Sequence, residues 1–348
     1  MNSPSPLAPF TVLDVGGTTL RIAEYAPRTG TLSRVRRVPV DGMARDADAP
    51  VPVLQERVVA QLVREIEAHS AAGPAPRAVG VAFAGPITAA GLVLAAPTVW
   101  GGRGEPLPLG ARLTARLGVP VVVVNDLTAA AWRYAATEDE PFCLLTVSSG
   151  IGNKVFRSGE ILLDADGHGG ELGHWTCDTS PDAPLCDCGG RGHLGAIASG
   201  RGVLAAARRA ATADPDGFAG SLLSALTPGG RAAALTNEAL AAAVRADDPF
   251  ATSVLRSTLT PLAQAIASVF TSIGICRYIV MGGFALAVGE RYRRLLVGEL
   301  VRLGCFGLAA DRVDAMVALG VADDDHGLIG AGRLLAERLP VPAGQGVR

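Results

Sequence analysis

The chain has 348 residues, of which 49% are hydrophobic and 18% are charged, so it is long and apolar enough to bury one or two cores and is not a disordered protein. Its formal net charge of -2 argues against a nucleic-acid-binding surface. No apolar stretch reaches the roughly 18 to 20 residues that span a bilayer, and residues 1–6 lack the pattern of a signal peptide. We expect a cytoplasmic protein with no nucleic-acid or membrane partner.

The first third of the chain predicts strands and helices in alternation. Strands are predicted at 10–15, 20–25 and 32–40, and a helix at 52–68, where Leu54, Val58, Leu62 and Ile66 recur every four residues. Two buried strands at 79–83 and 119–124 follow, and a helix at 127–134 comes directly after the second. Polar residues stand at the carboxyl ends of both strands, where ligands of α/β sheets bind.

The rest of the chain repeats this alternation. Short strands are predicted from 142, followed by a loop rich in His and Cys at 167–193. Residues 200–275 have helical spacing broken at 228–230, and strands at 278–281 and 315–319 precede a helix at 328–339. The pattern predicts an α/β fold, with a second lobe beginning near 142.

A glycine-rich turn follows the first predicted strand, with the sequence Asp14-Val15-Gly16-Gly17-Thr18-Thr19. Glycines let backbone N–H groups approach phosphate oxygens, and a carboxylate beside them suits a magnesium shell. An ordinary Gly-Gly hairpin is the alternative. No Gly-Lys-Ser/Thr follows, which excludes a Walker loop.

Asn125 and Asp126 stand between a very apolar strand and a helix. Asp126 is placed to deprotonate a bound hydroxyl, but an Asp at such a junction is often only a helix N-cap. Residue type alone leaves the two roles equally supported.

A third motif combines Glu171 and His174 with the run Cys186-Asp187-Cys188-Gly-Gly-Arg-Gly-His193. Paired cysteines in a cytosolic chain favour a metal over a disulfide, and four N and S ligands from one loop suit a tetrahedral structural zinc ion. Cys177 is an alternative ligand, and free thiols are the alternative to a metal site.

These motifs, in this order, resemble the ROK family of repressors, open reading frames and sugar kinases over nearly the whole chain. Asp14-x-Gly16-Gly17-Thr18 resembles the phosphate motif of the family, Gly85-Pro86 its sugar loop, and Asn125-Asp126 its substrate-and-base pair. Ser149-Gly150-Ile151-Gly152 resembles the second phosphate turn of the family. The most specific block is Glu171-x-Gly173-His174 with the Cys-x-Cys run after it. Gly282-Gly283 and residues 327–331 resemble the elements on the adenosine side.

The resemblance implies a two-lobed actin-like ATPase fold with ribonuclease H-like lobes and an active site in the interlobe cleft. The expected division is an N-terminal lobe at 1–126, a larger C-terminal lobe with the zinc loop at 127–327, and a last helix at 328–348 that packs back on the N-terminal lobe. Dimers are common in the family, so a homodimer is expected by analogy.

The resemblance also implies a role for each matched residue. Asp126 would be the general base, and Gly85, Asn125, Glu171 and His174 would hold substrate hydroxyls. Mg-ATP would be positioned by Asp14, Gly16, Gly17, Thr18, Ser149, Gly150, Gly152, Gly282 and Gly283. Lys154, the only lysine of the chain, either adds positive charge near the second phosphate turn or is a solvated turn residue.

The chain departs from the family pattern at several positions. His193 replaces a cysteine, which leaves His174, Cys186, Cys188 and His193 as the implied zinc ligands. Gly195 stands where sugar kinases carry a Glu that binds the anomeric end of the sugar, so a carboxylate anchor is missing. Asn153-Lys154-Val155-Phe156 replaces a glycine-rich stretch, and Pro97-Thr98 replaces a Pro-Asn.

The Cys-x-Cys form without the following Glu resembles one branch of the family, the C7-cyclitol 7-kinases of aminocyclitol biosynthesis in actinomycetes. A cyclitol has no hemiacetal carbon, so a kinase that acts on it does not need the carboxylate that binds the anomeric end of a sugar. The resemblance therefore implies ATP-dependent phosphorylation of the exocyclic hydroxymethyl of a valiolone- or valienone-type ring. The alternatives are a hexose or amino-sugar kinase such as a glucokinase, and a sugar-binding regulator, for which only 13 residues precede Asp14, too few for a helix-turn-helix.

Overall fold

The computed structural model describes residues 8–101, 104–164 and 166–339 and divides them into two compact units. Unit 1 contains the described residues up to Asp139, residues 161–169 and those from Asp323 onward. Unit 2 contains Glu140–Glu160 and Gly170–Ala322. In the described residues no helix has the length and apolar character needed to cross a membrane.

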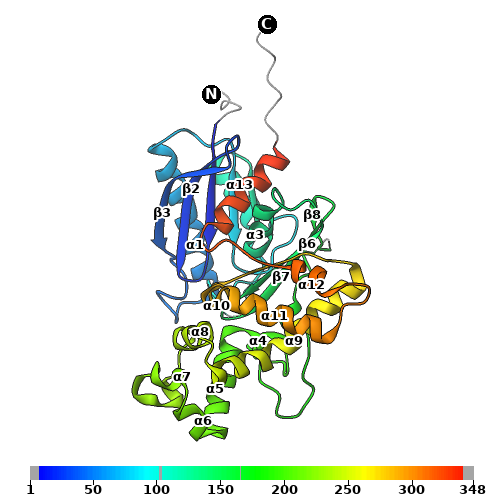
Figure 1. Cartoon of the computed structure of the whole chain (residues 1–348). Helices are drawn as coiled ribbons and strands as arrows, with labels where there is room; N and C mark the ends of the chain where they lie inside the picture. The colour runs from blue at the N-terminus through cyan, green and yellow to red at the C-terminus, as the bar shows by residue number, and fades with distance from the viewer. Residues whose placement is uncertain (1–7, 102–103, 165, 340–348) are drawn as a thin grey trace. The chain divides into compact units, whose positions relative to one another are not determined.

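Unit 1 is built on a five-stranded sheet in the order β3-β2-β1-β4-β5 (Figure 1). Its strands are β1 (Phe10–Val15), β2 (Thr19–Ala26), β3 (Thr31–Pro39), β4 (Val79–Phe83) and β5 (Val121–Asn125). The first three strands are antiparallel, whereas β1, β4 and β5 run parallel, with Asp14 opposite Ala82 and Phe83 opposite Asn125. This register brings the carboxyl ends of β1, β4 and β5 to one edge.

Helices cover both faces of this sheet, because alternate strand residues point to opposite sides. Leu13 packs in a cluster with α1 (Val51–Ala71) and α2 (Leu109–Leu117). Val12 packs in a second cluster with α3 (Asp126–Tyr134) and α13 (His326–Arg338), which lie together in Figure 1.

The unit boundaries differ from the division expected from the sequence. Residues 127–139 were expected in the second lobe, but α3 belongs to unit 1 because it packs extensively against α13, and Ala129 shares a buried cluster with Leu328. The C-terminal segment of unit 1 begins at Asp323, whereas it was expected to begin at residue 328. The last helix packs on β1, β2 and β4.

Unit 2 contains a second five-stranded sheet in the order β10-β9-β6-β7-β8. Its strands are β6 (Phe142–Val147), β7 (Ile151–Arg157), β8 (Glu160–Ile161), β9 (Tyr278–Met281) and β10 (Val317–Leu319). Its α-helices are α4 (Leu194–Ala198), α5 (Gly200–Ala213), α6 (Pro215–Ala219), α7 (Leu222–Ala225), α8 (Asn237–Arg245), α9 (Pro249–Ile273), α10 (Gly283–Val288), α11 (Glu290–Leu303) and α12 (Ala310–Met316). Short 3₁₀ turns lie at Leu172–His174, Pro228–Gly230 and Ala232–Ala234.

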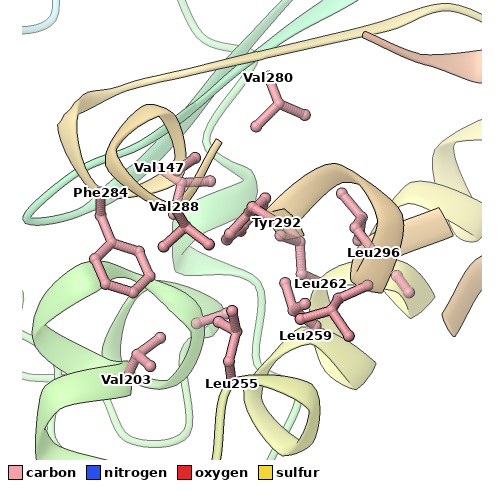
Figure 2. Packing of buried hydrophobic residues seen from close by; sticks show 14 of the residues in the cluster. Val147, Val203, Leu255, Leu259, Leu262, Val280, Phe284, Val288, Tyr292 and Leu296 are labelled. Carbon is pink, nitrogen blue, oxygen red and sulfur yellow. The ribbon is translucent and has the colours of Figure 1, made fainter. Parts of the chain in front are cut away.

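The core of unit 2 forms where α5, α9, α10 and α11 meet the sheet (Figure 2). Phe284 and Tyr292 are buried and meet edge to face, with ring centroids 6.4 Å apart. Val147 and Val280 supply the strand side of the same cluster. The core therefore fixes the ends of β6 and β9, where the glycine turns of this unit begin.

Two elements differ from the sequence expectation. A strand is predicted at 315–319, whereas α12 continues through Met316 and β10 begins at Val317. Val313 and Met316 are both buried at a three-residue spacing, which is the period of a helix face. Helix α2 was not expected; it ends at Gly118, whose φ of 67° is the left-handed conformation typical of a helix C-terminus.

Candidate active site

The turn after β1 is short and closely packed. Its ends are closed by a hydrogen bond from Gly16 N to the Thr19 carbonyl at 3.0 Å. A Cβ on Gly17 would lie 2.6 Å from the Thr98 carbonyl oxygen, so only glycine fits this close approach. Thr18 is exposed. The turn can therefore present N–H and hydroxyl groups to a phosphate.

Asp14 is tied to its own unit on three sides. Its carboxylate forms an ion pair with Arg21 of β2, and a second guanidinium nitrogen of Arg21 lies 3.6 Å from Asp325. A Cβ on Gly327 would lie 2.6 Å from the Asp14 carboxyl carbon, so the start of α13 closes over this group. Burial raises the pKa of Asp14, and the Arg21 guanidinium opposes that rise. The carboxylate is thus fixed by β1, β2 and α13.

Asn125 and Asp126 have separate positions at the start of α3. The Asn125 side-chain oxygen accepts hydrogen bonds from Leu127 N at 3.0 Å and Thr128 N at 3.3 Å, so Asn125 is the N-cap. Its side-chain nitrogen donates to the Gly85 carbonyl at 2.9 Å. Asp126 is therefore the first residue of the helix, and its half-buried carboxylate lies where the helix dipole favours negative charge.

The predicted sugar-loop residue Gly85 follows β4 and needs to be glycine. Its φ is 139°, and a Cβ there would lie 2.1 Å from the Ala95 carbonyl oxygen. The structure thus brings Gly85, Asn125 and Asp126 together at the carboxyl edge of the first sheet.

In unit 2 the two remaining glycine turns lie side by side. The 148–150 turn closes through a hydrogen bond from Ser148 N to the Gly150 carbonyl at 2.9 Å. A Cβ on Gly282 would lie 2.6 Å from the Val147 carbonyl oxygen, and one on Gly283 would lie 3.8 Å from the Ser148 hydroxyl. A Cβ on Gly150 would meet open space. Ser149, Gly150, Gly152, Gly282 and Gly283 therefore surround the ends of β6 and β9.

The Glu171 to His174 segment is fastened to β7 by buried polar residues. The Asn153 side-chain oxygen accepts a hydrogen bond from Leu172 N at 2.9 Å, and the Lys154 ammonium lies 3.9 Å from a carboxylate oxygen of Glu171. Asn153 is 5% exposed and Lys154 is 4% exposed. The expectation of a solvated turn lysine at 154 is therefore wrong, because this side chain enters the unit from a central strand position.

The four predicted metal ligands form one cluster in unit 2. One ligand atom from each of His174, Cys186, Cys188 and His193 lies within 4.8 Å of the others, and both thiols are free of disulfides. Cys186 N donates to the Gly190 carbonyl at 2.8 Å, and this hydrogen bond closes a tight turn that contains both cysteines. Cys177 lies apart, with its Sγ 3.5 Å from the Gly192 carbonyl. Two sulfur and two nitrogen donors fit a tetrahedral zinc ion.

Arg201 is a linking residue that the sequence reasoning missed. Its Nε donates to the Ser149 carbonyl at 2.6 Å, and its guanidinium pairs with Asp187, between the two cysteines. The phosphate turn and the cysteine turn are thus joined by one side chain. The available signal was its position at the start of the helical run predicted from residue 200.

The architecture of the two units is that of the two-lobed actin-like ATPases, and the solved structures that share it include sugar kinases and a ROK family transcriptional regulator. One is a glucokinase from Streptomyces griseus in complex with glucose and AMPPNP, with a TM-score of 0.70 and 25% identity over 94% of this chain and 98% of that chain. Another is a hexokinase from Thermus thermophilus, with a TM-score of 0.70 and 27% identity over 93% of this chain and 97% of that chain.

The sequence model of the ROK family matches residues 11–338, and the chain belongs to this family. It is 57% identical over 340 residues to a C(7)-cyclitol 7-kinase of Streptomyces hygroscopicus subsp. jinggangensis, covering 97% of each chain. It is 32% identical to a 2-epi-5-epi-valiolone 7-kinase of Actinoplanes sp., covering 98% of this chain and 96% of the relative. The chain is accordingly a phosphotransferase with an alcohol group as acceptor.

Proposed function

We propose that this protein is an ATP-dependent kinase that phosphorylates the exocyclic primary hydroxyl of a C7-cyclitol of the valiolone or valienone type in aminocyclitol biosynthesis. The observation that carries the proposal is the 57% identity, over 97% of both chains, with an enzyme named C(7)-cyclitol 7-kinase. The more distant relative named for 2-epi-5-epi-valiolone supports the same substrate class.

In the proposed reaction Asp126 accepts the proton of the primary hydroxyl of the acceptor. The hydroxyl oxygen attacks the γ-phosphorus of ATP, and ADP leaves. The separate N-cap at Asn125 supports this role, because it leaves helix capping to another residue. Gly85, Asn125, Glu171 and His174 are proposed to hold the ring hydroxyls. Phosphoryl transfer depends mainly on alignment and charge neutralisation, so one base with few cationic groups suffices.

ATP and Mg²⁺ are proposed to bind at the glycine turns of each unit. The open space beside Gly150 and the closely packed glycine turn at Gly16 and Gly17 support phosphate binding. Asp14 is the carboxylate proposed to lie near the metal. Mg²⁺ supplies neutralisation of phosphate charge. The proposed positions on the nucleotide side are Asp14, Gly16, Gly17, Thr18, Ser149, Gly150, Gly152, Gly282 and Gly283.

A structural zinc ion is proposed at His174, Cys186, Cys188 and His193. Imidazole replaces thiolate at His193 without changing the tetrahedral preference of zinc. The metal would hold the cysteine turn against the segment that carries Glu171, and no step of the reaction is assigned to it.

A substrate panel tests the proposed function. Purified protein with Mg²⁺ and ATP is offered glucose, N-acetylmannosamine, 2-epi-5-epi-valiolone and valienone, and phosphate gain is followed by mass spectrometry. Phosphorylation of the cyclitols alone supports the proposal. Equal or better phosphorylation of glucose would overturn it and identify a hexokinase with a rebuilt pocket.

A further inference from the structure

Two neighbouring residues of β7 depart from the usual character of a central strand. Asn153 and Lys154 are polar, both are buried, and their side chains leave opposite faces of the strand. Each nevertheless meets the same segment, since Asn153 binds the backbone of Leu172 and Lys154 approaches Glu171. The segment that carries Glu171 is thus held from two sides.

The Lys154 side chain packs directly against Gly170. The φ of Gly170 is 74°, and a Cβ there would lie 2.2 Å from the Asn153 carbonyl oxygen and 3.1 Å from the Lys154 ammonium. Any other residue would displace both the backbone and the lysine. Gly170, Asn153 and Lys154 therefore pack together next to Glu171.

Burial is strongly unequal in the ion pair. The Lys154 side chain is 6% exposed and that of Glu171 is 65% exposed. A buried ammonium costs several kcal/mol of desolvation, so such a group is retained where its charge has a use. Of the 31 basic residues 30 are arginine, and this buried position instead carries the compact, rotatable donors of a lysine.

We propose that Lys154 is a positioning residue that fixes the exposed carboxylate of Glu171 for hydrogen bonding to ring hydroxyls of the acceptor. The inference rests on the proposed substrate-binding role of Glu171. An unrestrained Glu side chain would lose rotamer entropy when the acceptor binds, and the buried ammonium removes much of that cost in advance.

Steady-state kinetics of variants test this inference. Since immobilising one side chain costs about 0.5 to 1.5 kcal/mol, Lys154→Met should raise KM for the acceptor about two- to thirteenfold, with KM for ATP unchanged. Lys154→Arg should not restore it. Because the lysine acts through the carboxylate, Lys154→Met combined with Glu171→Gln should be no worse than Glu171→Gln alone. Arg157→Met, which removes a charge from the exposed end of the same strand, is the matched control.

A spectroscopic signature of the folded wild-type protein separates positioning from mere stability. Since Lys154 is the only lysine, protein labelled with [ε-¹³C]lysine gives one side-chain signal, which should shift when the acceptor is added without ATP. Glu171→Gln should abolish that shift. An unmoved signal, an unchanged KM in Lys154→Met, or multiplying losses in the double variant would overturn the inference.

Failure of the proposed function can be distinguished from failure of the inference about Lys154. If the wild-type protein phosphorylates only hexoses, the cyclitol assignment fails, and the same variants and the same signal are then measured with the accepted hexose. The role of Lys154 is decided by that comparison in either case.

Discussion

Asn125 and Asp126 illustrate how adjacent residues divide structure and chemistry. Asn125 caps α3 and binds the Gly85 carbonyl, whereas Asp126 accepts a short-range hydrogen bond from Leu127 N at 2.8 Å. The two residues should therefore respond differently to substitution.

Asp126→Asn should lower kcat by about 10²- to 10⁴-fold, because an amide cannot accept the proton of the hydroxyl. The free energy of unfolding should change by less than about 0.5 kcal/mol, since the amide oxygen can still accept from Leu127 N. Turnover near the wild-type rate would show that the base is another group. Asn125→Ala is the contrasting variant and should cost about 1 kcal/mol of stability through loss of the cap.

Substitutions at the cysteine turn can distinguish the four predicted zinc ligands from the nearby Cys177. Wild-type protein should contain about one zinc ion per chain by elemental analysis, and Cys188→Ala should lower that content because the site loses a thiolate. Cys177→Ala should keep the wild-type content, since Cys177 lies beside the Gly192 carbonyl instead. Zinc loss in Cys177→Ala together with zinc retention in His193→Ala would contradict the assigned ligands.

Among the elements, α13 and α3 pack with their backbones in close contact. A Cβ on Gly330 would lie 1.6 Å from the Ala129 carbonyl oxygen, so the glycine permits the helices to approach. The neighbouring cluster of Phe10, Val12 and Leu335 depends on that approach.

Gly330→Ala should therefore destabilise unit 1 by about 1 to 3 kcal/mol, because backbone atoms cannot yield as side chains do. The check is the thermal midpoint together with amide hydrogen exchange in α3 and α13. Gly298→Ala in α11 is the matched control: a Cβ there meets open space, and it should gain about 0.5 to 1 kcal/mol. Equal stability of the two variants would refute the packing argument.

For the whole molecule, an ion pair between distant parts of the chain ties the C-terminal segment into unit 1. Arg133 of α3 donates to Asp323 at 2.7 Å, and this bond holds the pKa of Asp323 at about 2. A lowered pKa means that the stabilisation is complete above the unfolded value of 3.8 and is lost as the pH falls toward 2.

Asp323→Asn should accordingly flatten the decline of stability between about pH 4 and pH 2, measured by denaturant unfolding across that range. Asp324→Asn, whose pair with Arg37 is exposed on both sides, should keep the wild-type slope. An unchanged slope in Asp323→Asn would show that this ion pair does not contribute.

Much of the fold follows from local pattern, because the strands β1, β4 and β9 are short, nearly continuous buried runs and the helix α1 carries an apolar residue every four positions. The unit to which α3 belongs could not be predicted in this way, since it depends on a contact with a helix about 200 residues later. The clustering of the four predicted metal ligands could be foreseen, because they come from one loop. The burial of Lys154 could not, because it depends on space left by Gly170 on another segment.

The interleaving of the two units has a consequence for how the protein is made on the ribosome. The last residue of unit 2 is Ala322, whereas the apolar cluster on one face of the first sheet needs Leu328, Ala331 and Leu335. That face stays open to solvent until α13 has been synthesised. Unit 2, although it starts later in the chain, can therefore complete its core first, and unit 1 closes only after α13 has been made.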